Sequence, residues 1–303
     1  MPPHHTPLLK SPLLSKLNKA PVYLKCENMQ QTNSFKARGA WQAIHALKNR
    51  SNGVITHSSG NHGAALSWAA KAKGIDAHIV VPENAPPSKI DNIKRYGGIV
   101  HFCAAGLDAR EEKMKDIQAQ GNQVFIPPYN HEDVIAGQST CAREIFSEVK
   151  DIQALLVPVG GGGLLSGSAI AARDDSPKTN VIGCEPTEAD DAYRSFHSGN
   201  LEHPGNPNTM ADGLRTGLGD ITFGYIKSLV HDIYTVSEEE IYQAWAFVIH
   251  HLKLVIEPSC AVPFAVWKSQ LHRWQGQPVA IIITGGNVNL SNLPPHQDSF
   301  NFI

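Results

Sequence analysis

The sequence predicts an α/β protein built from two parallel sheets with helices on both faces. Three observations support this fold class. Short runs rich in valine and isoleucine alternate with segments of helical periodicity along most of the 303 residues. These runs are almost continuously apolar, as in strands that helices cover on both faces. Loops of small residues follow three of the runs, and ligands of such folds bind at these strand ends.

The expected elements begin with a strand at residues 22–26 and end with a strand at residues 280–283. The other strands are expected at 53–56, 77–81, 99–102, 124–126, 155–159 and 181–184. Helices are expected over 35–48, 64–73, 87–96, 108–120, 133–149, 164–172, 238–253 and 260–271. In the first helix, Trp41, Ile44 and Leu47 form an apolar stripe, and Ser34 is a good N-cap.

Four of the expected strands fall between residues 53 and 128. We therefore expect residues 53–128 to form a small inserted domain. Residues 1–52 and 129–303 then form a larger domain from both ends of the chain. A chain of this length is ample for two hydrophobic cores.

Composition excludes several classes of protein. The formal net charge is −2, so nothing in the charge suggests a nucleic-acid binder. The N-terminus lacks the basic and apolar regions of a secretory signal, and no apolar run is long enough to span a bilayer. The five cysteines are dispersed without a CxxC pair, as expected of reduced thiols. We therefore expect a cytoplasmic protein with no membrane or nucleic-acid partner.

Lys36 lies in the stretch NSFKARGA, residues 33–40, in the first turn of an expected helix. The positive end of the helix dipole disfavours a cationic lysine there. Schiff-base chemistry requires a neutral, partly desolvated lysine. An ordinary solvated lysine is the alternative, and this stretch alone leaves it open.

Four consecutive glycines, residues 160–163, follow an expected buried strand and precede a helix. Their backbone N–H groups at a helix N-terminus favour a phosphate. No lysine follows as in a P-loop, and Ser166 occupies the third glycine position of a dinucleotide fingerprint. Four glycines are costly for a simple turn, so the sequence favours a phosphate site.

Two further loops follow expected strands. Residues 58–63, SSGNHG, offer hydroxyls, an amide and an imidazole, and could hold a carboxylate; capping of the next helix is an equal alternative. Residues 284–287, TGGN, allow close approach of a flat ligand, with Thr284 near a ring nitrogen. An ordinary exit from a strand is the alternative for this second loop.

In this order, the stretches resemble the fold-type II pyridoxal-phosphate (PLP) enzymes of the threonine dehydratase and serine racemase family. The resemblance runs from about residue 7 to residue 290. The motifs that carry it are SFKARG at 34–39, SSGNHG at 58–63, PVGGGGL at 158–164, IEP at 256–258 and TGGNV at 284–288. Each motif is weak alone, but their joint order is specific.

The resemblance implies a role for each site residue. Lys36 would carry PLP as a Schiff base and act as the base on one face of the substrate Cα. The other cofactor-binding residues would be Phe35 on the ring, Asn61 at the phenolic oxygen, Gly160, Gly161, Gly162, Gly163 and Leu164 at the phosphate, Gly213 and Glu257 at the ring edge, and Thr284 at the pyridine nitrogen. The substrate carboxylate would lie against Ser58, Ser59, Asn61 and His62. A neutral Thr284 hydroxyl does not hold the ring nitrogen protonated, which favours β-elimination over transamination.

Ser59 decides the finer prediction. The resemblance associates alanine at this position with dehydratases and serine with racemases. Racemisation requires a proton donor on each face of Cα, here Lys36 and Ser59. We expect a serine racemase-like enzyme that also dehydrates L-serine and L-threonine. A threo-3-hydroxyaspartate dehydratase, or a threonine dehydratase without racemase activity, stays open, as does a Ser59 hydroxyl that only binds the carboxylate.

A divalent-metal site is expected near residues 185–191, EPTEADD. A turn could bring the carboxylates of Glu185 and Asp191 and the Ala189 carbonyl around one hard cation, and the racemase branch has this spacing. Oxygen ligands favour Mg²⁺ or Ca²⁺, with Mn²⁺ as a further candidate. Helix capping by Asp190 and Asp191 is the alternative.

The family implies a homodimer. A hypothesis of another class is a non-catalytic phosphate- or nucleotide-binding protein on the same fold. Lys36 argues against it, since pure binding needs no lysine there.

Overall fold

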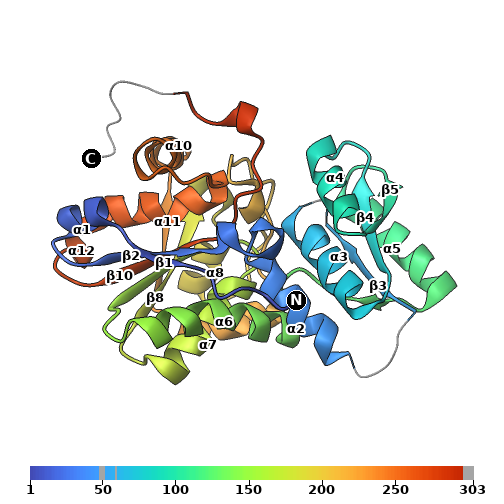
Figure 1. Cartoon of the computed structure of the whole chain (residues 1–303), viewed down its shortest axis with the longest axis horizontal. Coiled ribbons are helices and arrows are strands. Elements are labelled where there is room, and N and C mark those ends of the chain that lie inside the picture. Colours follow the sequence, from blue (N-terminus) through green and yellow to red (C-terminus); the bar gives the residue numbers. More distant parts are fainter. Residues whose placement is uncertain (48–51, 59, 296–303) are drawn as a thin grey trace.

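The structure is a computed structural model that describes residues 1–47, 52–58 and 60–295. Its two sheets lie at the centres of two lobes (Figure 1). The larger sheet has the strand order β1-β2-β10-β7-β8-β9, and the smaller has the order β5-β4-β3-β6. Neighbouring strands are parallel except β1, which is antiparallel to β2. The predicted α/β fold with two sheets is therefore confirmed.

The strands of the two sheets have the following bounds. The larger sheet contains β1 (Leu8–Lys10), β2 (Val22–Cys26), β7 (Ala154–Pro158), β8 (Asn180–Pro186), β9 (Asp232–Val236) and β10 (Val279–Ile283). The smaller contains β3 (Val54–His57), β4 (Ala77–Pro82), β5 (Ile99–Cys103) and β6 (Val124–Phe125). The strands β1 and β9, which the sequence analysis does not predict, are the two edges of the larger sheet.

Helices cover the faces of both sheets (Figure 1). They are α1 (Pro12–Asn18), α2 (Lys36–Ala46), α3 (Asn61–Lys73), α4 (Pro87–Arg95), α5 (Leu107–Gly121), α6 (Glu132–Glu148), α7 (Gly163–Asp175), α8 (Asp191–Ser198), α9 (Asp220–Leu229), α10 (Glu238–Phe247), α11 (Pro258–Ser269) and α12 (Leu271–Trp274). The helix expected over 238–253 ends as α10 at Phe247 and continues as a wider π turn, Val248–Leu252.

Alternate residues of each central strand enter different cores. Leu156 and Ile281 lie in one core of the larger sheet, and Leu155 and Ile282 lie in the core on its other face. Successive side chains of a strand point to opposite faces, so a strand covered on both faces must be apolar throughout. This explains why the central strands could be predicted from nearly continuous valine and isoleucine.

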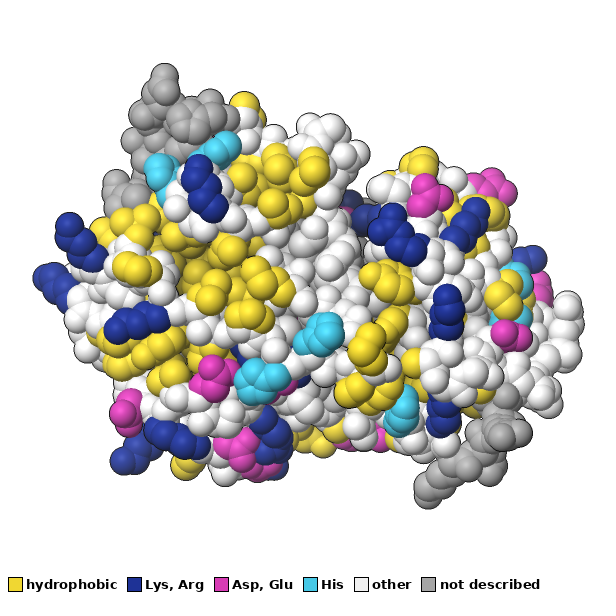
Figure 2. Space-filling model, in the orientation of Figure 1, with side chains coloured by type: hydrophobic (Ala, Val, Ile, Leu, Met, Phe, Trp, Pro, Cys, Tyr) yellow, Lys and Arg dark blue, Asp and Glu magenta, His cyan; other side chains and the backbone are white. Residues whose placement is uncertain are grey.

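Figure 2 shows hydrophobic side chains gathered over the lobe of the larger sheet, with charges of both signs scattered over this face. Within the described part of the chain, no helix combines the length and apolarity required to cross a membrane. We propose that the two lobes correspond to the predicted domains, residues 53–128 and the remainder. The helix α2 leads from the larger lobe toward the smaller (Figure 1).

Candidate active site

Lys36 is the first residue of α2, and its surroundings favour a neutral amine. Its Nζ donates a hydrogen bond to the Pro128 carbonyl at 2.8 Å and lies 5.1 Å from the centre of the Phe35 ring. Burial lowers the pKa of Lys36 to about 8. An amine with this pKa can reach its neutral, nucleophilic form near physiological pH.

The predicted cap of α2 is wrong. Ser34 has an extended backbone, φ −159° and ψ 154°, and forms a bridge with Gly285. Phe35 occupies the N-cap position and its N–H donates to the Thr284 carbonyl at 3.0 Å. The helix therefore begins two residues after Ser34 because the preceding segment pairs with the loop after β10. This pairing brings Lys36 beside that loop.

The four glycines connect β7 to the N-terminus of α7, as predicted. Gly162 has φ +87°, which favours glycine, and a Cβ at Gly161 would lie 2.2 Å from the Tyr129 ring. Glycine is therefore required at positions 161 and 162. Because Tyr129 follows Pro128, the acceptor of the Lys36 amine, the same short segment contacts both Lys36 and the glycines.

Gly213 lies next to the glycine loop. A Cβ at Gly160 would be 3.1 Å from the Gly213 carbonyl oxygen. The Gly213 N–H donates to Ser259 Oγ at 3.1 Å, which fixes this segment to α11. Gly213 belongs to a short turn, η4 (Asp212–Leu214), that closes one side of the loop.

Asn61 is the first residue of α3, and both the nitrogen and the oxygen of its side-chain amide form hydrogen bonds. Its Nδ2 lies 3.0 Å from each carboxylate oxygen of Glu257, and its Oδ1 accepts from Asn287 Nδ2 at 2.8 Å. The Asn287 backbone N–H also donates to Glu257, at 2.9 Å. Burial raises the pKa of Glu257. These contacts bring the loop after β3 against the loop after β10.

Thr284 directly follows the buried strand β10, and its hydroxyl faces Cys260. Thr284 Oγ1 lies 3.2 Å from Cys260 Sγ, and this sulfur also accepts from the Gly285 N–H at 3.1 Å. Burial raises the pKa of Cys260 to about 12, so the group is a neutral thiol. Cys260 was not predicted, and a scattered cysteine gave no signal in the sequence.

The matching family model is described as "Pyridoxal-phosphate dependent enzyme" and covers residues 2–285. The chain is 43% identical to the β-hydroxyaspartate dehydratase of Paracoccus denitrificans over 296 residues, 96% of this chain and 94% of that protein. It is 44% identical to the serine racemase of Dictyostelium discoideum over 96% of this chain and 91% of that protein. The structure of maize serine racemase matches with a TM-score of 0.92 and 39% identity, over 96% of this chain and 91% of that chain.

The chain belongs to the family of pyridoxal-phosphate-dependent enzymes. The site fits this cofactor. Because the glycine loop has no side chains, none covers its backbone N–H groups at the start of α7, where a phosphate would bind. The half-buried Lys36 amine lies close to Phe35 and is joined to the glycine loop through residues 128 and 129. The hypothesis of a non-catalytic binding protein is therefore set aside, since the relatives of this PLP enzyme are racemases and ammonia-lyases.

The predicted substrate-binding residues Ser58, Ser59 and His62 follow β3, and the structure describes Ser58 and His62. Ser58 Oγ accepts from the Gly60 N–H at 3.3 Å, whereas Ser59 lies outside the described residues. The His62 imidazole is buried and its Nε2 pairs with the Ile126 carbonyl at 3.0 Å. Burial and the charge of Lys36 lower its pKa to about 3. A carboxylate would therefore meet His62 through its backbone N–H, in the first turn of α3.

The predicted metal ligands Glu185 and Asp191 are both buried. Burial and the charge of Asp191 raise the pKa of Glu185 well above its ordinary value, and burial raises the pKa of Asp191 to about 6. A divalent cation would offset the cost of two buried carboxylates, so the pair fits the predicted metal. The described residues include no cluster of three or more His, Cys, Asp and Glu side chains suited to a metal. The predicted site needs only these two, with the Ala189 carbonyl as third ligand.

The alternative for this segment was helix capping by Asp190 and Asp191, but the carboxylate that caps α8 is that of Glu185. Its carboxylate accepts from the N–H groups of Ala192 at 3.0 Å and Tyr193 at 2.8 Å, in the first turn of α8. Asp191 Oδ2 accepts from the Leu218 N–H at 3.1 Å. Asp190 makes no side-chain cap. Each carboxylate retains acceptor capacity beyond these bonds, so capping and metal binding are compatible.

Proposed function

We propose that this PLP-dependent enzyme is a serine racemase that also dehydrates L-serine and L-threonine to a 2-oxo acid and ammonia. One observation carries the proposal: the half-buried Lys36 amine lies beside the Thr284 loop and is joined to the glycine loop through residues 128 and 129. The serine racemases among its relatives, at 40 to 44% identity, support the substrate.

Each residue of the site has a role in this proposal. When bound, PLP withdraws electrons from the substrate Cα and makes its proton acidic. Lys36, neutral at its lowered pKa, takes that proton from one face. The loop of residues 58–62 orients the substrate carboxylate, and Ser59 delivers a proton to the opposite face to give the other enantiomer. Loss of the β-hydroxyl, rather than reprotonation, gives dehydration.

Lys36 and Ser59 can be tested separately. The native protein should show a visible absorbance band that borohydride bleaches, and Lys36→Ala should lack both the band and all activity. Ser59→Ala should abolish the formation of D-serine from L-serine while much of the dehydration remains. If D-serine formation survives this change, the assignment of Ser59 as a proton donor is wrong.

A dehydratase of threo-3-hydroxyaspartate is the second candidate function. A β-hydroxyaspartate dehydratase at 43% identity and an L-threo-3-hydroxyaspartate ammonia-lyase of Saccharomyces cerevisiae at 42% support it. Purified protein should be assayed with L-serine, D-serine, L-threonine and threo-3-hydroxyaspartate, with and without Mg²⁺. The substrate with the highest kcat/KM decides between the two functions.

We also propose a cytoplasmic homodimer that binds Mg²⁺ (or Ca²⁺ or Mn²⁺) at Glu185, Ala189 and Asp191. The family resemblance supports the dimer, and Met29 and Val255 offer apolar side chains that are 48% and 43% exposed. The chain segments that carry them are adjacent, since Asn28 Nδ2 donates to the Val255 carbonyl at 3.3 Å. Light scattering coupled to size-exclusion chromatography measures the mass, and a monomer would contradict the dimer.

A further inference from the structure

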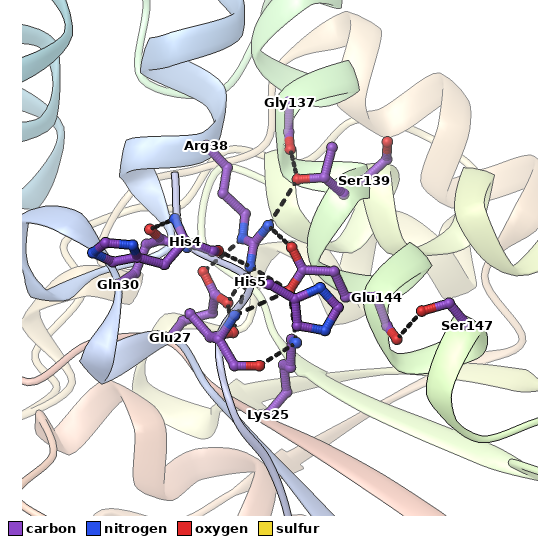
Figure 3. Close-up of polar contacts among 12 residues, drawn as sticks. His4, His5, Lys25, Glu27, Gln30, Arg38, Gly137, Ser139, Glu144 and Ser147 are labelled. Carbon is purple, nitrogen blue, oxygen red and sulfur yellow. Dashed lines mark hydrogen bonds and ion pairs between the residues drawn. The ribbon is translucent and has the colours of Figure 1, made fainter. Parts of the chain in front are cut away.

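Four charged side chains, three of them buried and one largely buried, lie together in one cluster (Figure 3). They are Lys25 on β2, Glu27 directly after it, Arg38 on α2 and Glu144 on α6. The side chains of Lys25 and Glu27 are fully buried, and those of Arg38 and Glu144 are 2% and 16% exposed. Isolated buried charges are strongly unfavourable, so their retention requires close pairing. The proposed chemistry uses none of these four groups.

Arg38 is the centre of this charge cluster. Its Nε and Nη2 donate to the two oxygens of Glu27 at 2.7 and 2.8 Å. Its Nη1 and Nη2 donate to the two oxygens of Glu144 at 2.6 and 2.8 Å. Although burial opposes it, hydrogen bonds to Glu27 and Glu144 raise the pKa of Arg38. Two bidentate pairs use the planar fork of a guanidinium, which lysine cannot reproduce.

The N-terminal segment closes over the charge cluster. Lys25 Nζ donates to Glu144 Oε2 and to the Thr6 carbonyl, both at 2.7 Å, and Thr6 Oγ1 donates to Glu27 at 2.5 Å. Figure 3 shows His4 and His5 beside the guanidinium of Arg38 and the carboxylate of Glu144. The His4 carbonyl accepts from Arg38 Nη2 at 3.3 Å. The cluster thus joins α2 to β2, to α6 and to the start of the chain.

The helix α2 contacts both lobes, so the position of its first turn depends on both of them. Ala40, Ala43 and Ile44 pack in the core of the smaller sheet. The glycine loop, by contrast, follows β7 of the larger sheet. A shift of the smaller lobe would therefore pull on α2 and move Lys36 relative to the glycines. Arg38, two residues after Lys36 and on the far side of the helix, ties the first turn to the larger lobe.

We propose that Arg38 is a positioning residue: with Glu27, Glu144 and Lys25 it holds the first turn of α2 so that the Lys36 amine stays in its place beside Pro128. This proposal rests on the proposed role of Lys36. It predicts that weakening the charge cluster exposes the amine to water. The amine is then protonated more easily, and PLP attaches more slowly.

The test measures the attachment of PLP to the apo-protein as a function of pH. The rate at which the visible band forms reports the pKa of the Lys36 amine, because only the neutral amine attacks the aldehyde. Arg38→Gln, Arg38→Lys and Glu144→Gln are compared with the native protein. Arg143→Gln is the matched control, since Arg143 precedes Glu144 but pairs at the surface with Asp174 and Asp175. Thr140→Val, which removes one acceptor of Arg38 Nη1, is a milder variant if the others fail to fold.

In the native protein and in Arg143→Gln, we expect the midpoint of the pH profile near the lowered pKa of about 8. In the cluster variants it should move toward the ordinary value of lysine, roughly 10.4, and each unit should slow attachment about tenfold at neutral pH. The proposal is overturned if the cluster variants melt at a lower temperature but their pH profile of PLP attachment keeps the native midpoint. The cluster would then only stabilise the fold. A native protein that forms no band contradicts the role of Lys36 instead.

Discussion

The amide of Asn61 lies 3.0 Å from both carboxylate oxygens of Glu257, which is 196 residues further along the chain. Asn287 holds the other end of the same amide. An amide nitrogen carries two N–H groups. We propose that one N–H serves both oxygens of Glu257 and that the second would donate to the phenolic oxygen of PLP. In this proposal, Glu257 orients Asn61 toward the cofactor.

Glu257→Gln should weaken the binding of PLP. A glutamine accepts through only one oxygen, and its own amide would face the Asn61 donor. The loss of one hydrogen bond to a charged group predicts roughly a tenfold or greater rise in the Kd. Fluorescence titration of the apo-protein with PLP measures it. Glu239→Gln, an exposed change on α10, is the control and should leave the Kd unchanged; equal affinity in both variants would show that Glu257 does not orient Asn61.

Gly161→Ala should severely damage the glycine loop, because the new Cβ would lie 2.2 Å from the Tyr129 ring. Either the ring or the loop must move, and we expect a loss of stability of about 1–3 kcal/mol together with weaker PLP binding. Gly224→Ala is the matched control. Gly224 lies inside α9, and a Cβ added there would meet no atom within 4 Å. Thermal melting with and without PLP measures both variants, and similar behaviour would mean that Tyr129 does not constrain the loop.

The buried His62 should make the stability depend on pH. Its folded-state pKa is lowered to about 3, whereas an unfolded histidine titrates near roughly 6.5. Between these values the unfolded chain binds the extra proton, so stability falls as the pH falls. We expect His62→Gln to lose stability less steeply than the native protein from about pH 6.5 downward, as urea unfolding measures. The exposed His272→Gln should keep the native slope.

Asp191→Asn should remove any stabilisation by Mg²⁺. If Mg²⁺ binds the native protein at Glu185 and Asp191, saturating metal raises the melting temperature by roughly several degrees. Asparagine lacks the charge, and the rise should disappear. Asp190→Asn alters the neighbouring residue, which pairs at the surface with Arg194, and should keep the rise. A native protein whose melting temperature is insensitive to Mg²⁺, Ca²⁺ and Mn²⁺ would contradict the metal site.

Lys89 on α4 and Asp212 beside Gly213 form an ion pair between the two lobes. Their side chains are 34% and 40% exposed, so the pair should contribute less than about 1 kcal/mol to stability. Because it joins the lobes next to the predicted ring edge, we expect Lys89→Gln to raise the KM for the amino acid about two- to fivefold at low salt. High salt screens the native pair and should reduce the difference. A KM equal to that of the native protein at low salt would show that the pair has no role in binding.

Sequence reasoning predicted the parts of this site that local chemistry encodes. Four glycines between a strand and a helix, at residues 160–163, favour a phosphate loop, and the structure places them between β7 and α7 as expected. The central apolar strands could be predicted equally well, because a strand covered on both faces requires apolar residues throughout. The edge strands β1 and β9 have only one neighbour and carry a weaker apolar signal, so they were missed.

Only the tertiary structure decided which distant residues meet. The sequence favours Ser34 as a cap, but pairing with Gly285 extends its backbone instead. Nothing in the local sequence joins Asn61 to Glu257, or Arg38 to Glu144 across 106 residues. Hydrogen bonds and ion pairs of this kind depend on the packing of whole helices and sheets. Their geometry therefore arises from long-range contacts, whereas turns, caps and apolar runs arise from the preferences of neighbouring residues.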